Sequence, residues 1–141
     1  MKKIFYIFFV SIIYVSQLIG AERNFAVINS YTDSGFYLYH SADSFIKTPL
    51  LGTHIIKNDS IVTEDKAKVK IVFDTELYLL LSENSQIGIE EISFIKPADT
   101  APSKINIVIK LAQGKIFSNI PYLETASYYH ILTPNAFCNA I

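Results

Sequence analysis

The stretch "KAKVKIVF", residues 66–73, decides the fold class of this chain. Its apolar and charged residues alternate: the first set is Ala67, Val69, Ile71 and Phe73, and the second is Lys66, Lys68 and Lys70. A period of two places successive side chains on opposite faces of a strand. The stretch therefore predicts a β-strand with one face in the core and one face in solvent.

Similar short runs, rich in β-branched and aromatic residues, lie on both sides of this stretch and are bounded by turn residues. The expected strands are residues 25–28, 36–40, 53–56, 60–63, 66–73, 77–82, 86–95, 105–112, 114–120 and 128–132, with another beginning after a Thr-Pro turn. Residues 41–52 and the polar, proline-containing residues 96–104 read as loops. No segment has a helical pattern. We expect an all-β fold, namely a sandwich, roll or short β-solenoid of short antiparallel strands.

The N-terminus has the layout of a secretory signal peptide. Lys2 and Lys3 precede an uncharged apolar stretch of 16 residues, Ile4 to Ile19, and the small residues Gly20 and Ala21 follow it. We expect residues 1–21 to be removed, with cleavage after Ala21, and the protein to be exported to the periplasm or cell envelope. The alternative is a retained membrane anchor, although 16 residues is short against the roughly 20 that span a bilayer.

Composition excludes several classes of function. Without Lys2 and Lys3, the 12 basic residues fall to 10 against 13 acidic ones, a net charge of −3. A nucleic-acid partner would need a basic stripe, so we expect none. Cys138 is the only cysteine, which rules out an internal disulfide and a zinc cluster of cysteines. We expect neither a cofactor nor a metal.

The residues that could carry catalysis form no motif. His40, His54 and His130 lie far apart in the sequence, and Glu90 and Glu91 are adjacent, so on a strand they should point to opposite faces. The sequence therefore favours a non-enzymatic protein with no catalytic residues.

One enzymatic alternative remains open, a small exported hydrolase that uses Cys138 with His130. An activated cysteine would react quickly with iodoacetamide in the folded protein, whereas a cysteine that serves as a small apolar core residue would react slowly.

Tyrosine is frequent for a small domain. The tyrosines at issue are Tyr37, Tyr39, Tyr122, Tyr128 and Tyr129. Exposed tyrosines suit a binding face for sugars or protein, because the ring is apolar and the hydroxyl forms hydrogen bonds. The alternative is ordinary packing with the hydroxyl groups at the surface.

Weak motifs in a fixed order give the chain a family likeness. Gly52 and Asp59 precede an "I-x-T" strand that contains Ile61 and Thr63, and the alternating strand and two further strands follow. Later a strand, Gly114, another strand and a "T-P-x-A" turn occur in order, the turn being formed by Thr133, Pro134 and Ala136. Over about residues 50–141 this order resembles the FecR-type domain of exported bacterial proteins. Residues 22–49 would then form an N-terminal β segment.

The resemblance implies a binding role rather than an enzymatic one. Family members that control a sigma factor do so through a cytoplasmic N-terminal part, but here only three residues precede the apolar stretch, so we do not expect that role. The implied function is an envelope module that binds protein or a cell-wall polymer such as peptidoglycan. Contact with a membrane is expected only through the signal segment, if it stays uncleaved.

The chain also departs from the family pattern. "DTE", residues 74–76, stands where the family has an Asp-Gly turn, and "TPNAFCNAI" ends before the family's next strand, which begins Arg-Gly-Thr. We therefore expect a domain that is incomplete at its C-terminus, with an edge that favours self-association. A non-functional fragment of a longer FecR-domain protein is the remaining alternative.

Overall fold

The computed structural model describes residues 22–41, 44–95, 104–124, 126–135 and 137–140. These residues form thirteen β-strands, and no helix occurs among them. The strands are β1 (Glu22–Arg23), β2 (Phe25–Tyr31), β3 (Phe36–Ser41), β4 (Ser44–Lys47), β5 (His54–Ile56), β6 (Ser60–Thr63), β7 (Val69–Val72), β8 (Tyr78–Leu81), β9 (Gln86–Ile95), β10 (Lys104–Gln113), β11 (Ile116–Asn119), β12 (Tyr128–Leu132) and β13 (Phe137–Ala140). The all-β expectation is confirmed.

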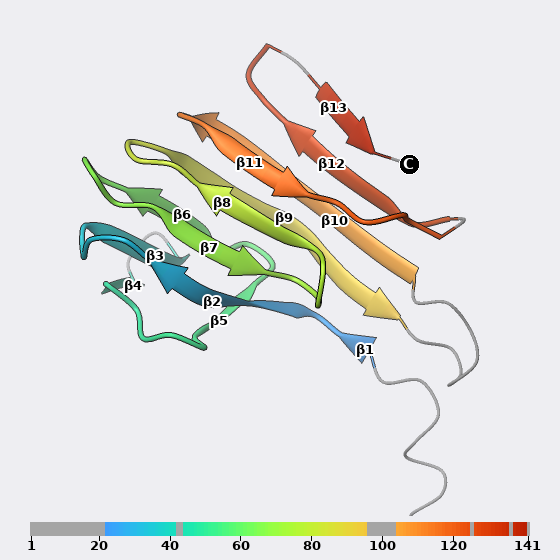
Figure 1. Ribbon diagram of the computed structural model, residues 1–141, viewed down its shortest axis with the longest axis horizontal. Coiled ribbons are helices and arrows are strands. Elements are labelled where there is room, and N and C mark those ends of the chain that lie inside the picture. Colours follow the sequence, from blue (N-terminus) through green and yellow to red (C-terminus); the bar gives the residue numbers. More distant parts are fainter. Residues whose placement is uncertain (1–21, 42–43, 96–103, 125, 136, 141) are drawn as a thin grey trace, which may run out of the picture.

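Two sheets pack face to face as a sandwich. The larger sheet has the order β13-β12-β10-β9-β6-β3-β4, with β1 also paired to β9, and the smaller has the order β11-β8-β7-β2-β5. Figure 1 shows β11, β8 and β7 lying over β10, β9 and β6. A purely antiparallel arrangement was expected, but β10 and β12 are parallel. The reason is β11: the chain leaves the larger sheet after β10, forms β11 in the other sheet, and returns in its original direction.

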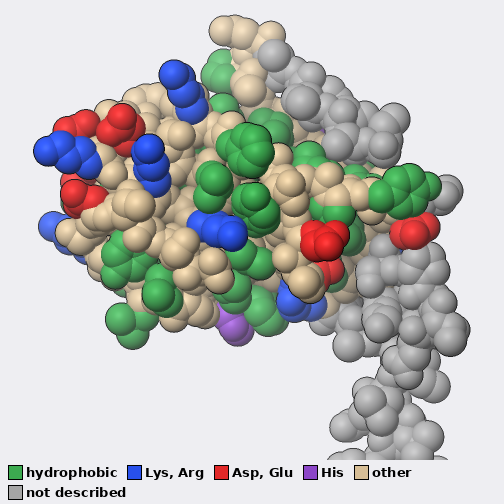
Figure 2. All heavy atoms as spheres, in the orientation of Figure 1, with side chains coloured by type: hydrophobic (Ala, Val, Ile, Leu, Met, Phe, Trp, Pro, Cys, Tyr) green, Lys and Arg blue, Asp and Glu red, His purple; other side chains and the backbone are tan. Residues whose placement is uncertain are grey.

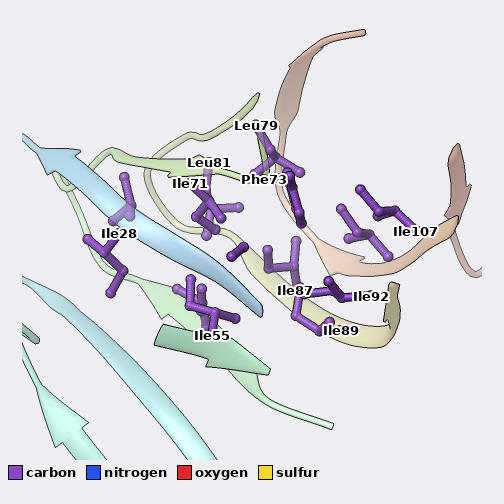
Figure 3. Packing of buried hydrophobic residues seen from close by; sticks show 14 of the residues in the cluster. Ile28, Ile55, Ile71, Phe73, Leu79, Leu81, Ile87, Ile89, Ile92 and Ile107 are labelled. Atoms are coloured by element: carbon purple, nitrogen blue, oxygen red, sulfur yellow. The ribbon is translucent and has the colours of Figure 1, made fainter. Parts of the chain in front are cut away.

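Alternating side chains from both sheets fill the core between them. Ala67, Val69, Ile71 and Phe73 are all at most 1% exposed, which confirms the predicted facing of this stretch. In Figure 3, Ile71 and Phe73 point toward residues of the facing sheet, among them Ile87. The strand is shorter than the predicted 66–73, because Lys66 has a φ of 66° and belongs to the preceding turn. The Lys66 backbone N–H is bound there by the Glu83 carboxylate at 2.8 Å.

Residues 41–52 were expected to be a loop, but they contain β4, which pairs antiparallel with β3. All four side chains of β4 are exposed, since it is the edge strand of the larger sheet. An exposed edge strand has no buried face, so its sequence carries no alternation from which it could have been predicted.

Strands from both predicted segments interleave. β2 and β3, from residues 22–49, pair directly with β7 and β6, from residues 50–141, and they share one core. The predicted signal peptide and residues 96–103 of the predicted loop lie outside the described residues, while Lys104 is the first residue of β10. Nowhere in the described ranges is there a helix of the length and hydropathy that a bilayer span requires.

Candidate binding surface

Three aromatic side chains gather on the outer face of the larger sheet, at its β4 edge. Tyr37 and Tyr39 alternate with buried Leu38 on β3, and Phe45 is the β4 partner of Tyr39. The Phe45 ring centroid lies 5.4 Å from that of Tyr39 and 6.0 Å from that of Tyr37, and Phe45 is 57% exposed. We call Tyr37, Tyr39 and Phe45 the β3–β4 aromatic cluster. Rings at these separations hold one another in place.

Polar neighbours fix the orientation of Tyr37. Its hydroxyl donates a hydrogen bond of 3.1 Å to Glu64 Oε1, and Lys47 Nζ lies 5.9 Å from the centre of its ring. The hydrogen bond to Glu64, followed by desolvation and the charge of Glu64, raises the pKa of Tyr37 above 10.0. The single hydroxyl proton of Tyr37 is therefore held in the hydrogen bond to Glu64.

Small side chains border the cluster on the side away from the edge. Across the sheet, Tyr39 is the register partner of Ser60, and Ser60 is the partner of Gly88 on β9. Cross-strand partners project from the same face. The outer face therefore carries the small residues Ser60 and Gly88 beside the rings of Phe45 and Tyr39, with the Glu90 carboxylate close to Gly88.

The other three predicted tyrosines are separate from the cluster. Tyr129 is 1% exposed and belongs to the core, where its hydroxyl shares a 2.7 Å hydrogen bond with Ser118 Oγ. Tyr122 is 88% exposed in the segment between β11 and β12. The hydroxyl of Tyr128 donates a 2.8 Å hydrogen bond to Glu91 Oε1, which raises the pKa of Tyr128. The sequence therefore identified two of the three cluster residues.

The adjacency of Glu90 and Glu91 predicted that they point to opposite faces of the sheet, and this prediction is wrong. Val108 on β10 pairs with Glu91, but the next residue, Ile109, pairs with Ile89. Glu90 is therefore the extra residue of a β-bulge, which shifts the register of β9 against β10. Ile89 and Ile92 are both buried, three positions apart, and neither glutamate is. The bulge thus leaves both carboxylates off the core face.

The three histidines also lie apart in the structure. His40 Nδ1 is 3.0 Å from Oδ1 of Asp59, which is 1% exposed. His54 stacks on Phe25 with ring centroids 3.9 Å apart, and the ring of His130 lies 4.8 Å from that of Tyr128. The His40–Asp59 contact was not anticipated from the sequence, since 19 positions separate the two residues.

The predicted motif residues around Asp59 stabilise turns. Asp59 Oδ2 accepts a 2.9 Å hydrogen bond from the N–H of Ile56, three residues earlier. This bond closes the turn that joins β5 to β6. Gly52 has a φ of 84°, which glycine adopts readily in a turn, and its N–H donates to the Ile28 carbonyl at 2.7 Å. Ile61 is fully buried in the core.

Thr63 and Gly114 both contact the turn that joins β8 to β9. Thr63 is buried; its hydroxyl donates to the Ser82 carbonyl at 2.6 Å and accepts from the Ser85 N–H at 3.0 Å. Gly114 has a φ of 92°, and a Cβ there would lie 2.5 Å from the Cα of Ser85. These motif residues therefore have structural roles.

The remaining motif residues lie at the C-terminal end. Thr133 is partly buried and Pro134 exposed, whereas Ala136 lies outside the described residues. In the "DTE" turn, Asp74 Oδ1 accepts from the Thr75 N–H at 2.8 Å, and none of residues 74–76 has a positive φ. This turn therefore does not need the glycine that the family pattern has.

Strand pairing does not bring the predicted hydrolase pair together, and the described residues hold no candidate metal cluster. The register pairs Cys138 with Ile131 and His130 with Asn139, so the two hydrolase candidates are not cross-strand partners. No group of three His, Cys, Asp or Glu residues within the described ranges could hold a metal ion.

Three residues around the cluster were missed by sequence reasoning: Phe45, Lys47 and Glu64. Phe45 and Lys47 fell in the predicted loop, and Glu64 in a turn. The one feature of the sequence that could have indicated β4 is the pair of apolar residues in "SFI", residues 44–46, which follows the expected strand at residues 36–40. No family model, curated protein or solved structure matches the chain.

Proposed function

We propose that this chain is an exported, non-enzymatic binding domain of FecR type, which attaches to a cell-wall polymer such as peptidoglycan through the β3–β4 aromatic cluster. The order of its motif residues and its signal-like N-terminus support the family and the location in the periplasm or envelope. The observation that carries the binding role is the cluster itself, two tyrosines and an exposed phenylalanine in mutual contact on one sheet face.

The chemistry of the cluster favours a glycan. A sugar ring presents an apolar face of C–H groups, which packs on aromatic rings, and hydroxyl groups at its rim, which need hydrogen-bond partners. Phe45 supplies an exposed ring and Tyr39 a half-buried one. Lys47 and Glu64 place polar groups at Tyr37, and Ser60 lies opposite Tyr39. Gly88 itself adds no side chain to this face, and the nearby Glu90 carboxylate adds a hydrogen-bond acceptor.

An envelope protein is the second candidate partner, and the position of β4 favours it. β4 is an edge strand whose Phe45 and Ile46 are 57% and 42% exposed, so both of its faces present apolar surface. An extended segment of a partner could pair with this edge and place its side chains against these residues.

Co-sedimentation with purified peptidoglycan sacculi tests the proposal. We expect the wild-type protein to sediment with sacculi, and Tyr39→Ala and Phe45→Ser to reduce the bound fraction at least fivefold. Leu50→Ser is the matched control, because Leu50 is 82% exposed in the β4–β5 connection, outside the cluster. Loss of binding in the control as well, or none in the cluster variants, would reject the cluster as the binding surface.

Export is tested separately by N-terminal sequencing of the cell-associated protein. A mature chain that begins at Glu22 is expected. An intact Met1 in the membrane fraction would contradict cleavage and favour the anchor.

A further inference from the structure

The outer face of the smaller sheet contains a groove of ≈ 470 Å³, which is far from the aromatic cluster because it lies on the other side of the sandwich. One cross-strand row runs through it: Phe117 on β11 pairs with Leu80, Leu80 with Lys70, and Lys70 with Ser30 on β2. All four line the groove. With strands about 4.8 Å apart, the row is about 14 Å long.

The row changes from apolar to cationic along its length. Phe117 and Leu80 are 59% and 38% exposed, although they are large apolar residues. At the other end, Lys70 is joined by Lys68 and by the hydroxyl groups of Ser30 and Thr32. Figure 2 shows this face, with hydrophobic side chains gathered over its middle and a basic side chain among them.

The charge of the lysines is not neutralised within the groove. None of the residues that line it is acidic, and neither Lys68 nor Lys70 has an ion pair among the described residues. Lys70 Nζ instead lies over the Tyr78 ring, 4.3 Å from its centroid, which keeps the ammonium group on the outer face. An anion placed here meets two ammonium groups and the Ser30 hydroxyl without repulsion from a carboxylate, while the Thr32 hydroxyl is already bonded to the Lys66 carbonyl and the Lys68 N–H.

We propose that this groove binds an anionic lipid, with its phosphate at Lys68 and Lys70 and the start of its acyl chain on Leu80 and Phe117. A volume of this size is usual for a small-molecule site that combines apolar lining with a few convergent polar groups. The length of the row matches a headgroup plus the first part of a chain.

The test is titration of the protein isolated from the envelope with dihexanoyl-phosphatidylglycerol, which dissolves as single molecules. Dihexanoyl-phosphatidylcholine and inorganic phosphate are titrated in parallel. We expect saturable binding of the phosphatidylglycerol, weakened at least tenfold by the double variant Lys68→Gln/Lys70→Gln and by Phe117→Ser. Lys110→Gln and Leu50→Ser remove the same chemical groups elsewhere and should leave the affinity unchanged.

Three outcomes would overturn the proposal: equal binding of the phosphatidylcholine, equal binding of phosphate alone, or wild-type affinity in the groove variants. The substituted side chains are all outside the core, and thermal unfolding of each variant checks that it folds. Because the groove and the aromatic cluster lie on opposite sheets, Phe117→Ser should still sediment with sacculi. The two proposals can therefore fail independently.

Discussion

Gly114 and Gly52 both have a positive φ, but only Gly114 lies against another backbone. A Cβ at Gly114 would lie 2.5 Å from the Cα of Ser85, whereas one at Gly52 would meet nothing within 4 Å. Alanine at either position costs about 1–2 kcal/mol for the left-handed conformation, and Gly114→Ala adds a backbone clash. We expect Gly114→Ala to lower the free energy of unfolding by clearly more than Gly52→Ala, as measured by urea denaturation. Equal losses would contradict the close approach at Ser85.

Tyr37 and Tyr128 each donate a hydrogen bond to a glutamate, so titrating the two tyrosines gives two matched tests of these bonds. Each carboxylate raises the pKa of its tyrosine, Tyr37 and Tyr128 respectively, above 10.0. A raised pKa means that the stability from each bond is complete below pH 10.0 and is lost as the pH rises through the folded-state value. We expect Glu91→Ala to lower the pKa of Tyr128 alone, and Glu64→Ala that of Tyr37 alone, in an NMR titration. A Tyr128 pKa that is unchanged in Glu91→Ala would count against this bond.

At the level of elements, Thr63 joins the end of β6 to the β8–β9 turn. Thr63→Val keeps the shape but leaves the buried Ser85 N–H without its 3.0 Å acceptor. An unsatisfied buried donor costs about 1–3 kcal/mol. We expect that loss in unfolding experiments, together with faster amide exchange at Ser85. Thr63→Ser keeps the hydroxyl and should protect Ser85 as the wild type does, so rapid exchange in this variant would exclude the hydroxyl as the cause.

Strands with a buried face could be predicted from the sequence, and those without one could not. Ile61, Ile71 and Leu79 follow the alternation of their strands, because burial selects an apolar residue at every second position. β4 has no such constraint. The parallel pairing of β10 with β12 depends on the position of β11 in the other sheet, which local patterns do not encode.

The candidate site was predictable to the same degree. Tyr37 and Tyr39 are two positions apart on a strand, so the sequence alone predicts that they share one face of the sheet. Phe45 and Glu64 reach them only through strand pairing and a turn, at separations of up to 27 residues. The bulge at Glu90 could not be predicted either, since an extra residue in β9 is defined by its partner β10.

The whole molecule presents two sheet faces with different chemistry. The outer face of the larger sheet has aromatic rings beside small and polar residues, and that of the smaller sheet has apolar residues beside unpaired lysines. Two faces that point away from each other can be occupied at the same time. The proposals together describe a domain that holds a polymer on one side and a lipid on the other.

The edges of the larger sheet are β13 and β4. One side of β13 pairs with β12, and the other side has no strand partner among the described residues. Such an edge is a template for a second chain. We therefore expect sedimentation velocity to show association that increases with protein concentration. A single monomer boundary at every concentration would contradict self-association through this edge.

We expect the β3–β4 aromatic cluster to be the surface that contacts the cell-wall polymer, and aromatic ¹³C chemical shifts test this contact directly. Soluble fragments of peptidoglycan would be titrated into labelled protein while the ring signals of Tyr37, Tyr39, Phe45 and Tyr122 are followed. Tyr122 is 88% exposed but lies outside the cluster, so it reports non-specific contact. The account predicts saturable shifts at Tyr37, Tyr39 and Phe45 and none at Tyr122; shifts of equal size at Tyr122, or none in the cluster, would contradict it.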